Sequence, residues 1–171
     1  MHYTNTDNPI DFPKIDKPRC YQLIGVPGAG KSTWIKDQIW ALGLTVVSTD
    51  AFVEDYARSQ GKTYSEVFTD YMPTAVDLMA EQVVRARELG HTIIWDQTST
   101  TISSRAKKFR MLPGYEHIAV VFRTPEHTEL MRRLESRWEA GKIIPEHVIA
   151  SMIASWEEPS EEEGFKEIWY V

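Results

Sequence analysis

The sequence predicts an α/β fold in which helices cover both faces of a mostly parallel sheet. Short apolar, β-branched segments alternate with segments of helical period along most of the chain, which is the pattern of βαβ units. A glycine-rich turn joins the first apolar segment to the first helix. The length of 171 residues, 42% of them hydrophobic, suits one domain with a substantial core. We therefore expect a single α/β domain.

The expected elements follow one another without internal repeats. Strands are predicted at residues 20–24, 44–48, 91–96, 118–122 and 165–171, the last as an edge strand. Helices are predicted to end at residue 42 and to span 52–59, 64–89 and 125–140, with a basic helix near 105–110 and a last helix ending near 156. Gly43, Gly61 and Gly90 suit helix ends, and we expect Pro73 to break the long helix. The aromatic residues Tyr64, Phe68 and Tyr71 of that helix favour packing over a place in an acceptor cleft.

Composition and charge restrict the class of protein. The single cysteine, Cys20, excludes a disulfide framework and favours a reducing, cytoplasmic setting. No apolar run approaches the ~20 residues of a membrane span, and the N-terminus lacks the layout of a signal peptide, so we expect a soluble protein. The net charge of −6 argues against broad binding of nucleic acid but leaves a local basic groove open. Residues 1–18, with three prolines, are expected to form an extended arm before the domain at 19–171.

The glycine-rich turn matches the pattern Gly-x-x-x-x-Gly-Lys-Ser/Thr at residues 25–32, between a predicted strand and a predicted helix. Glycines let successive backbone N–H groups point at phosphate oxygens, and the helix adds its positive N-terminal end. Lys31 is expected to reach the β- and γ-phosphates of ATP, and the Ser32 hydroxyl to ligate Mg²⁺. The alternative is a turn that binds nothing, which has no use for this lysine and hydroxyl. The predicted nucleotide contacts of the loop are Gly25, Gly28, Ala29, Gly30, Lys31, Ser32 and Thr33.

Two carboxylates stand at the C-terminal ends of predicted strands, where open α/β sheets bind their ligands. Asp50 follows the second strand and Asp96 follows the third. Transfer to a hydroxyl needs a base within hydrogen-bond reach, and the metal needs an acidic neighbour. We assign the metal to Asp96 together with Ser32, and the base to Asp50. For Asp50 the alternative is a helix cap, because a helical segment follows it directly.

Cations are needed beside the transferred phosphoryl group, in addition to Lys31. Arg137 is the leading candidate, with Arg133 and Lys142 as further nucleotide contacts, because residues 141–145 resemble the hinge of a small helical lid. Arg132 and Arg133 could instead form a solvated helix face.

A second basic cluster lies in the helix near residues 105–110. It is the expected site for a nucleic-acid acceptor, and its alternative is an ordinary charged surface. Its members are Arg105, Lys107, Lys108 and Arg110.

The order and spacing of these segments resemble the kinase domain of phage polynucleotide 5′-hydroxyl kinases and other small kinases with the P-loop NTPase fold. The likeness is carried by residues 25–34, 48–50 and 93–98, and by Arg137 ahead of residues 144–145. It implies that Asp50 is the general base, that Asp96 supports the site and that Arg137 clamps the phosphates. The family has an arginine where this chain has Val53, and an asparagine where it has Ser99.

The sequence therefore predicts an ATP- and Mg²⁺-dependent phosphotransferase whose acceptor is an alcohol group. A nucleic-acid or nucleotide hydroxyl, such as a 5′-hydroxyl end or a modified base, is the leading acceptor. A kinase of a nucleoside, sugar or antibiotic is the second hypothesis. A nucleotide-binding switch that transfers nothing is the third.

Overall fold

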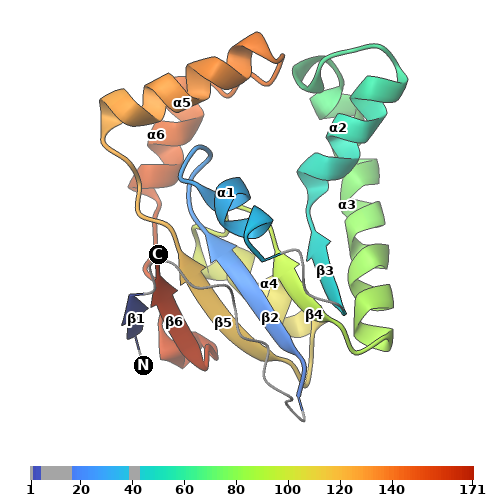
Figure 1. The fold of residues 1–171 in the computed structure, drawn as a ribbon, viewed down its shortest axis with the longest axis vertical. Coiled ribbons are helices and arrows are strands. Elements are labelled where there is room, and N and C mark those ends of the chain that lie inside the picture. Colours follow the sequence, from blue (N-terminus) through green and yellow to red (C-terminus); the bar gives the residue numbers. More distant parts are fainter. Residues whose placement is uncertain (1, 5–16, 39–42) are drawn as a thin grey trace.

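The computed structural model describes residues 2–4, 17–38 and 43–171 (Figure 1). The described strands form one six-stranded sheet in the order β1-β6-β5-β2-β4-β3, and every neighbouring pair is parallel. The strands are β1 (His2–Thr4), β2 (Arg19–Ile24), β3 (Leu44–Val47), β4 (Thr92–Trp95), β5 (Glu116–Val121) and β6 (Glu167–Tyr170). The chain leaves β2 toward β3 on one side and later returns to β5 on the other, so the C-terminal end of β2 is the point where a ligand crevice is expected.

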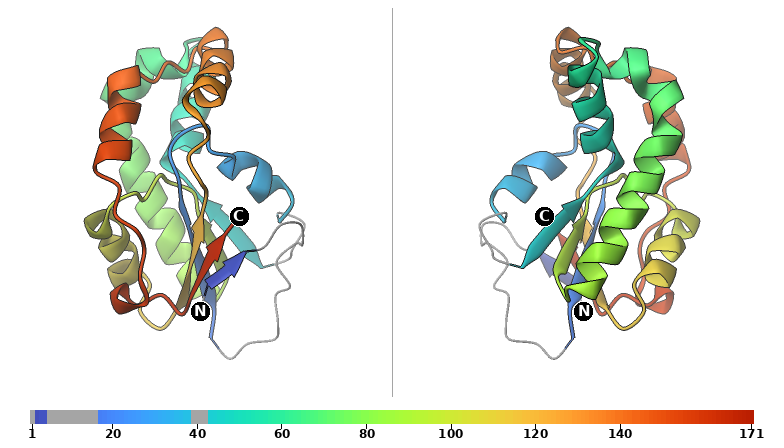
Figure 2. Two further views of the ribbon diagram at one scale, coloured as in Figure 1. Left: turned by 90° about the vertical axis from the view of Figure 1, so that its left-hand side faces the viewer. Right: turned by 90° about the vertical axis from the view of Figure 1, so that its right-hand side faces the viewer.

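Helices cover both faces of this sheet, as the sequence predicted (Figure 2). Alternate residues of β2 face opposite ways: Tyr21 and Leu23 pack with Ile35 of α1, while Cys20 packs with Met79 and Val83 of α3. Beyond the strand ends, α5 and α6 pack together as a small helical lid. The helices are α1 (Lys31–Lys36), α2 (Thr49–Ser59), α3 (Tyr64–Glu88), α4 (Ile102–Met111), α5 (His127–Glu139) and α6 (Glu146–Ala154), with a 3₁₀ turn, η1, at Glu161–Glu163.

Helix α3 shows that the break predicted at Pro73 was wrong. The helix is continuous over 25 residues, with Pro73 inside it. Pro73 has no N–H to donate to the carbonyl of Thr69, four residues earlier. Both residues lie on the exposed face of the helix, so the proline ring points to solvent and the Thr69 carbonyl can bond to water. On the buried face, Tyr71 stacks on Tyr56 of α2 with ring centroids 3.9 Å apart, and Ala75 packs in the same cluster. Packing against α2 thus holds both halves of α3 in line.

The two ends of the chain also differ from expectation. His2–Thr4 pairs with β6, so β6 lies inside the sheet and is not the edge strand that alternation alone predicted. The rest of the predicted N-terminal arm, apart from residues 17 and 18, and the last four residues of the predicted first helix lie outside the described residues. Within the described ranges, none of the helices has the length and apolar character that crossing a bilayer requires.

Candidate active site

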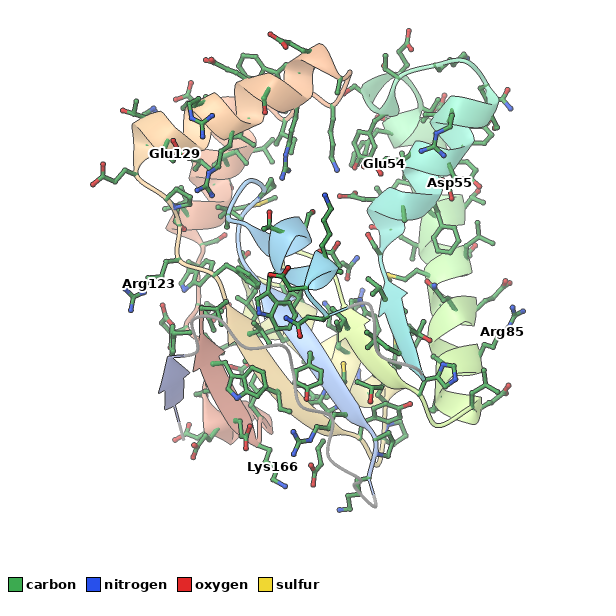
Figure 3. The ribbon with its side chains drawn as sticks, viewed as in Figure 1. Glu54, Asp55, Arg85, Arg123, Glu129 and Lys166 are labelled. Atoms are coloured by element: carbon green, nitrogen blue, oxygen red, sulfur yellow. The ribbon has the colours of Figure 1, made fainter. Side chains whose placement is uncertain are left out.

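A cleft of about 1050 Å³ opens beyond the C-terminal ends of the strands. Its walls come from the loop between β2 and α1, from α2, from the N-terminal half of α3, and from the lid. In Figure 3, side chains of α2 and α5 face each other across this space, with Glu54 on the side of α2 that faces it. Seven of the predicted site residues line the cleft: Gly28, Lys31, Ser32, Asp50, Asp96, Arg137 and Lys142.

The phosphate loop has the backbone that its glycines allow. Gly28 and Gly30 have φ values of 86° and 108°, in the left-handed region that favours glycine, and Gly30 immediately precedes α1. A Cβ atom at Gly25 would lie 3.0 Å from the Cβ of Phe122, so this glycine permits a close approach to the residue that follows β5. Gly25, Ala29, Gly30 and Thr33 do not line the cleft, although their backbone shapes the loop.

Lys31 lies at the base of the cleft and is partly buried. Its ammonium donates hydrogen bonds to the carbonyl oxygens of Gly25, at 2.6 Å, and Val26, at 2.9 Å. Burial lowers the pKa of Lys31 to about 8, and the negative charge of Asp96 opposes that effect. The ammonium is therefore poorly solvated, and an anion beside it would relieve this cost.

Asp50 lies in the first turn of α2, and the residue at the N-cap position is Ser48. Asp50 is therefore not the N-cap residue that the alternative predicted. Its carboxylate is held at both oxygens: the Tyr64 hydroxyl donates to Oδ1 at 2.7 Å, and the Lys142 ammonium donates to Oδ2 at 3.0 Å. The Asp50 side chain is still 47% exposed, so it is accessible from the cleft.

Asp96 follows β4 directly, and its backbone N–H donates to the Val47 carbonyl at 2.8 Å. This bond ties the end of β4 to the end of β3, so Asp96 and Asp50 line the same cleft although they are 46 positions apart. Burial raises the pKa of the Asp96 carboxyl, Lys31 lowers it, and the negative charge of Asp50 raises it further. A cation bound beside Asp96 would favour its charged form.

The arginines of α5 divide into two groups. Arg137 lines the cleft. Arg133 instead donates to the Gly28 carbonyl at 2.9 Å and to Glu129 at 2.8 Å, so it braces the phosphate loop from outside. Arg132 bonds Glu129 at the surface, as the alternative of a solvated helix face predicted.

Lys142 belongs to the lid but contacts the opposite wall. Besides its bond to Asp50, it lies 3.4 Å from the Glu54 carboxylate and 4.5 Å from the centre of the Tyr64 ring. Two further hydrogen bonds join the residues beside Lys142 to α3. The Ser65 N–H donates to the Gly141 carbonyl at 3.1 Å, and the Ile143 N–H donates to the Ser65 hydroxyl at 2.9 Å. The lid is therefore docked on the start of α3.

The predicted basic patch on α4 is not a surface patch. Arg105 is fully buried and bonds Glu163 of η1 and the Ser99 carbonyl. Lys108 is 3% exposed, donates to the Ser104 carbonyl and lies 5.4 Å from the centre of the Trp95 ring. Only Lys107 and Arg110 of the four reach solvent. Half of the charges expected to hold a nucleic acid therefore support the fold instead.

Sequence reasoning assigned no role to Glu54 and Ser65, and it favoured packing for Tyr64. Two signals could have suggested them. Glu54 stands four positions after Asp50, on the same face of α2. Thr63 and Glu66 form a capping box, which marks Tyr64 as the first residue of α3 and places it at a helix end beside the cleft.

Among the residues that the structure describes, no group of three histidine, cysteine, aspartate or glutamate side chains could form a metal cage. Ser32 and Asp96 suit a magnesium site that needs few protein ligands. Hydroxyl and carboxylate oxygens are hard ligands that suit Mg²⁺, which uses one or two protein groups together with substrate phosphates and water.

Comparison with known proteins identifies the family. The model of the AAA_33 family, described as an AAA domain, matches residues 22–159.

Two curated relatives are shikimate kinases. The protein of Mycobacterium ulcerans is 36% identical over 69 residues, 40% of this chain and 36% of that protein. The protein of Rhodococcus erythropolis is 44% identical over 69 residues, 40% of this chain and 38% of that protein. The match therefore spans less than half the length of either relative.

Solved structures share the fold. A structure from the PezAT chromosomal toxin-antitoxin system of Streptococcus pneumoniae has a TM-score of 0.70 at 20% identity, covering 91% of this chain and 67% of that one. A chain of the Pnkp1/Rnl/Hen1 RNA repair complex has a TM-score of 0.63 at 22% identity, covering 81% of this chain and 44% of that one. At these identities the likeness shows the fold alone.

Proposed function

The chain belongs to the AAA_33 family of AAA domains, and on this premise we propose that it is a kinase that transfers the γ-phosphoryl group of ATP to a hydroxyl. The observation that carries the proposal is the shared cleft: the phosphate loop with Lys31 and the accessible carboxylate of Asp50 open into one space. The names of the two shikimate kinases add support, although their matches cover only part of each protein.

The proposed roles follow from the chemistry of each side chain. Lys31 exchanges its two loop carbonyls for oxygens of the β- and γ-phosphates, where its ammonium is better compensated. Arg137, which lines the cleft from the lid, stabilises the negative charge of the same phosphates. Ser32 and Asp96 would hold Mg²⁺. When bound, this ion neutralises charge on the phosphates.

Asp50 is proposed as the general base. The acceptor oxygen forms a bond to the γ-phosphorus, the bond from that phosphorus to the bridging oxygen of ADP breaks, and the hydroxyl proton passes to the Asp50 carboxylate. Each carboxylate oxygen has a lone pair left after its bond to Tyr64 or Lys142, so the carboxylate can still accept that proton.

We propose a small molecule as the acceptor. Beyond Asp50 the docked lid forms part of the wall of the cleft, and this wall carries apolar side chains together with hydroxyls and a few charged groups, among them Arg58 and Lys62. Small-molecule sites commonly have this mixture, whereas binding of a polynucleotide depends on exposed cations. The apolar members of this wall are Ala57, Phe68, Met72, Ile143, Ile144 and Val148.

A nucleic-acid or nucleotide hydroxyl is the second candidate. It is favoured by the order of the motifs, which resembles that of polynucleotide 5′-hydroxyl kinases. Burial of Arg105 and Lys108 removes half of the cations first expected to bind it. A nucleic acid would have to place only its terminal nucleotide in the cleft.

Transfer of label from the γ-phosphate of ATP to a panel of acceptors tests these proposals. The panel contains sugars, nucleosides, shikimate and other small alcohols, together with 5′-hydroxyl DNA and RNA oligonucleotides. We expect label on a small molecule. Label on the oligonucleotides would favour the second candidate, and bound ATP without label on any acceptor would indicate a nucleotide-binding switch.

A further inference from the structure

Tyr64 connects the base to the helix that supports the docked lid. It is the first residue of α3, and its hydroxyl donates to Asp50 Oδ1 at 2.7 Å, from a position 14 residues further along the chain. Hydrogen bonds from a neutral donor to a carboxylate are shorter and stronger than those between neutral groups. The bond therefore constrains the rotation of the Asp50 carboxylate.

The tyrosine is itself held in place from several sides. Thr63 accepts from the Glu66 N–H and Glu66 accepts from the Thr63 N–H, which fixes the first turn of α3. The Tyr64 ring lies 5.5 Å from the Phe68 ring, between centres, and beneath the Lys142 ammonium. Little freedom is left for the hydroxyl to leave Asp50.

The hydroxyl remains a donor over the working range of pH. Burial raises the pKa of Tyr64, and the negative charge of Asp50 raises it further. A phenol in this setting keeps its proton, so Tyr64 is not itself the base. The contact that the structure gives its hydroxyl is the bond to Asp50.

We propose that Tyr64 is a positioning residue, which orients the Asp50 carboxylate toward the acceptor hydroxyl. This inference rests on the proposed function. Lys142 bonds the other oxygen, but it belongs to the lid and is expected to move with it, whereas Tyr64 is fixed at the start of α3. Tyr64 thus supplies the orientation that persists when the lid opens.

Substitution Tyr64→Phe tests the inference, because it removes the hydroxyl and keeps the ring that packs on Phe68. We expect kcat to fall about 10-fold or more, as for a misplaced catalytic group. The KM for ATP and the thermal midpoint are expected to stay at wild-type values. The matched control is Tyr56→Phe, which removes a hydroxyl from a tyrosine of α2 that stacks on Tyr71 and does not line the cleft. It should retain wild-type kcat.

A double-mutant cycle separates positioning from a structural role. If Tyr64 acts through Asp50, then Tyr64→Phe has no further effect on kcat in an Asp50→Ala background. Independent, multiplying losses would overturn the inference, as would an unchanged kcat in Tyr64→Phe alone. A wild-type protein that transfers no label at all would instead overturn the proposed function, and this inference with it.

Discussion

Arg105 of α4 and Glu163 of η1 form a buried, two-pronged ion pair between segments 58 positions apart. The Arg105 Nε and Nη2 atoms donate to the two Glu163 carboxylate oxygens at 2.8 and 3.1 Å, and a third bond runs from Nη1 to the Ser99 carbonyl at 3.0 Å. The arginine side chain is inaccessible to solvent, and the glutamate side chain is 9% exposed. Arg105 thus joins η1 to the loop that follows Asp96.

Removing one partner of this pair should destabilise the whole domain. Arg105→Ala leaves a buried carboxylate without its cation, and we expect the free energy of unfolding to fall by about 3–5 kcal/mol. Arg110→Ala, on the exposed face of the same helix, should cost no more than about 0.5 kcal/mol. Urea denaturation of both variants measures the difference. Equal, small losses would mean that Arg105 is a surface residue after all.

Docking of the lid on α3 depends on a glycine. Gly141 has a φ of 85°, and a Cβ atom there would lie 2.6 Å from the Cβ of Thr63. Gly141→Ala should therefore separate the lid from α3 and expose the amides of Ser65 and Ile143, which now form bonds across this contact. Hydrogen exchange of these two amides measures the change, and we expect their protection to be lost.

The control for this substitution is Gly114→Ala. Gly114 has a similar φ of 80° but no atom within 4 Å of the added Cβ, so this variant imposes the same backbone strain without the collision. It should keep the protection of both amides. Protection that survives in Gly141→Ala would show that the lid docks without this close contact.

His117 makes stability depend on pH. Gln22 donates to its Nδ1 at 3.0 Å, and its Nε2 lies 3.3 Å from the Leu112 carbonyl, in an interior that is almost closed to solvent. Burial lowers the pKa of His117 to about 4 from the usual 6.5. Between these values the unfolded chain binds a proton that the folded protein does not, so stability falls as the pH falls.

His117→Gln should weaken this dependence, because glutamine can accept from Gln22 and donate to Leu112 but does not titrate. Between pH 7 and pH 4.5 we expect the free energy of unfolding to fall on the order of 2 kcal/mol further in the wild type than in the variant. Denaturation curves at both pH values provide the measurement. Identical losses would mean that other groups account for the acid sensitivity.

Replacing Asp50 or Asp96 by asparagine should change different kinetic parameters. Asp50→Asn is expected to leave the affinity for Mg²⁺ and ATP nearly intact and to lower kcat by roughly 10²- to 10⁴-fold, as for a lost general base. Asp96→Asn is expected to raise the Mg²⁺ concentration that gives half-maximal rate. Titrations of metal and nucleotide on both variants test the assignment. The reverse pattern would interchange the two roles.

Local patterns were enough to predict which residues at the ends of the strands line the cleft. The glycine loop, Asp50 and Asp96 each follow a recognisable strand, and parallel strands bring their C-terminal ends to one edge. The glycines of the loop also suit its backbone, because few other residues adopt the positive φ values seen at Gly28 and Gly30.

Contacts between distant segments could not be predicted in the same way. Arg105 and Lys108 are three positions apart on α4, and which face of a short, charged helix packs inward depends on partners such as Glu163 that lie far along the chain. The same holds for Lys142, whose contact with Asp50 spans 92 positions and exists only because the lid docks on α3. The sequence had suggested a basic surface on α4, and Arg105 of that helix instead pairs with Glu163 of η1.

Lys31→Ala tests the central claim most directly, because Lys31 is the cation that the phosphate loop itself holds at the base of the cleft. The measurement is the rate of label transfer from the γ-phosphate of ATP to the acceptor identified for the wild type, with circular dichroism to establish that both proteins are folded. The account predicts transfer by the wild type and a loss of roughly 10²-fold or more in the folded variant. A folded Lys31→Ala variant that retains most of the wild-type rate would contradict it.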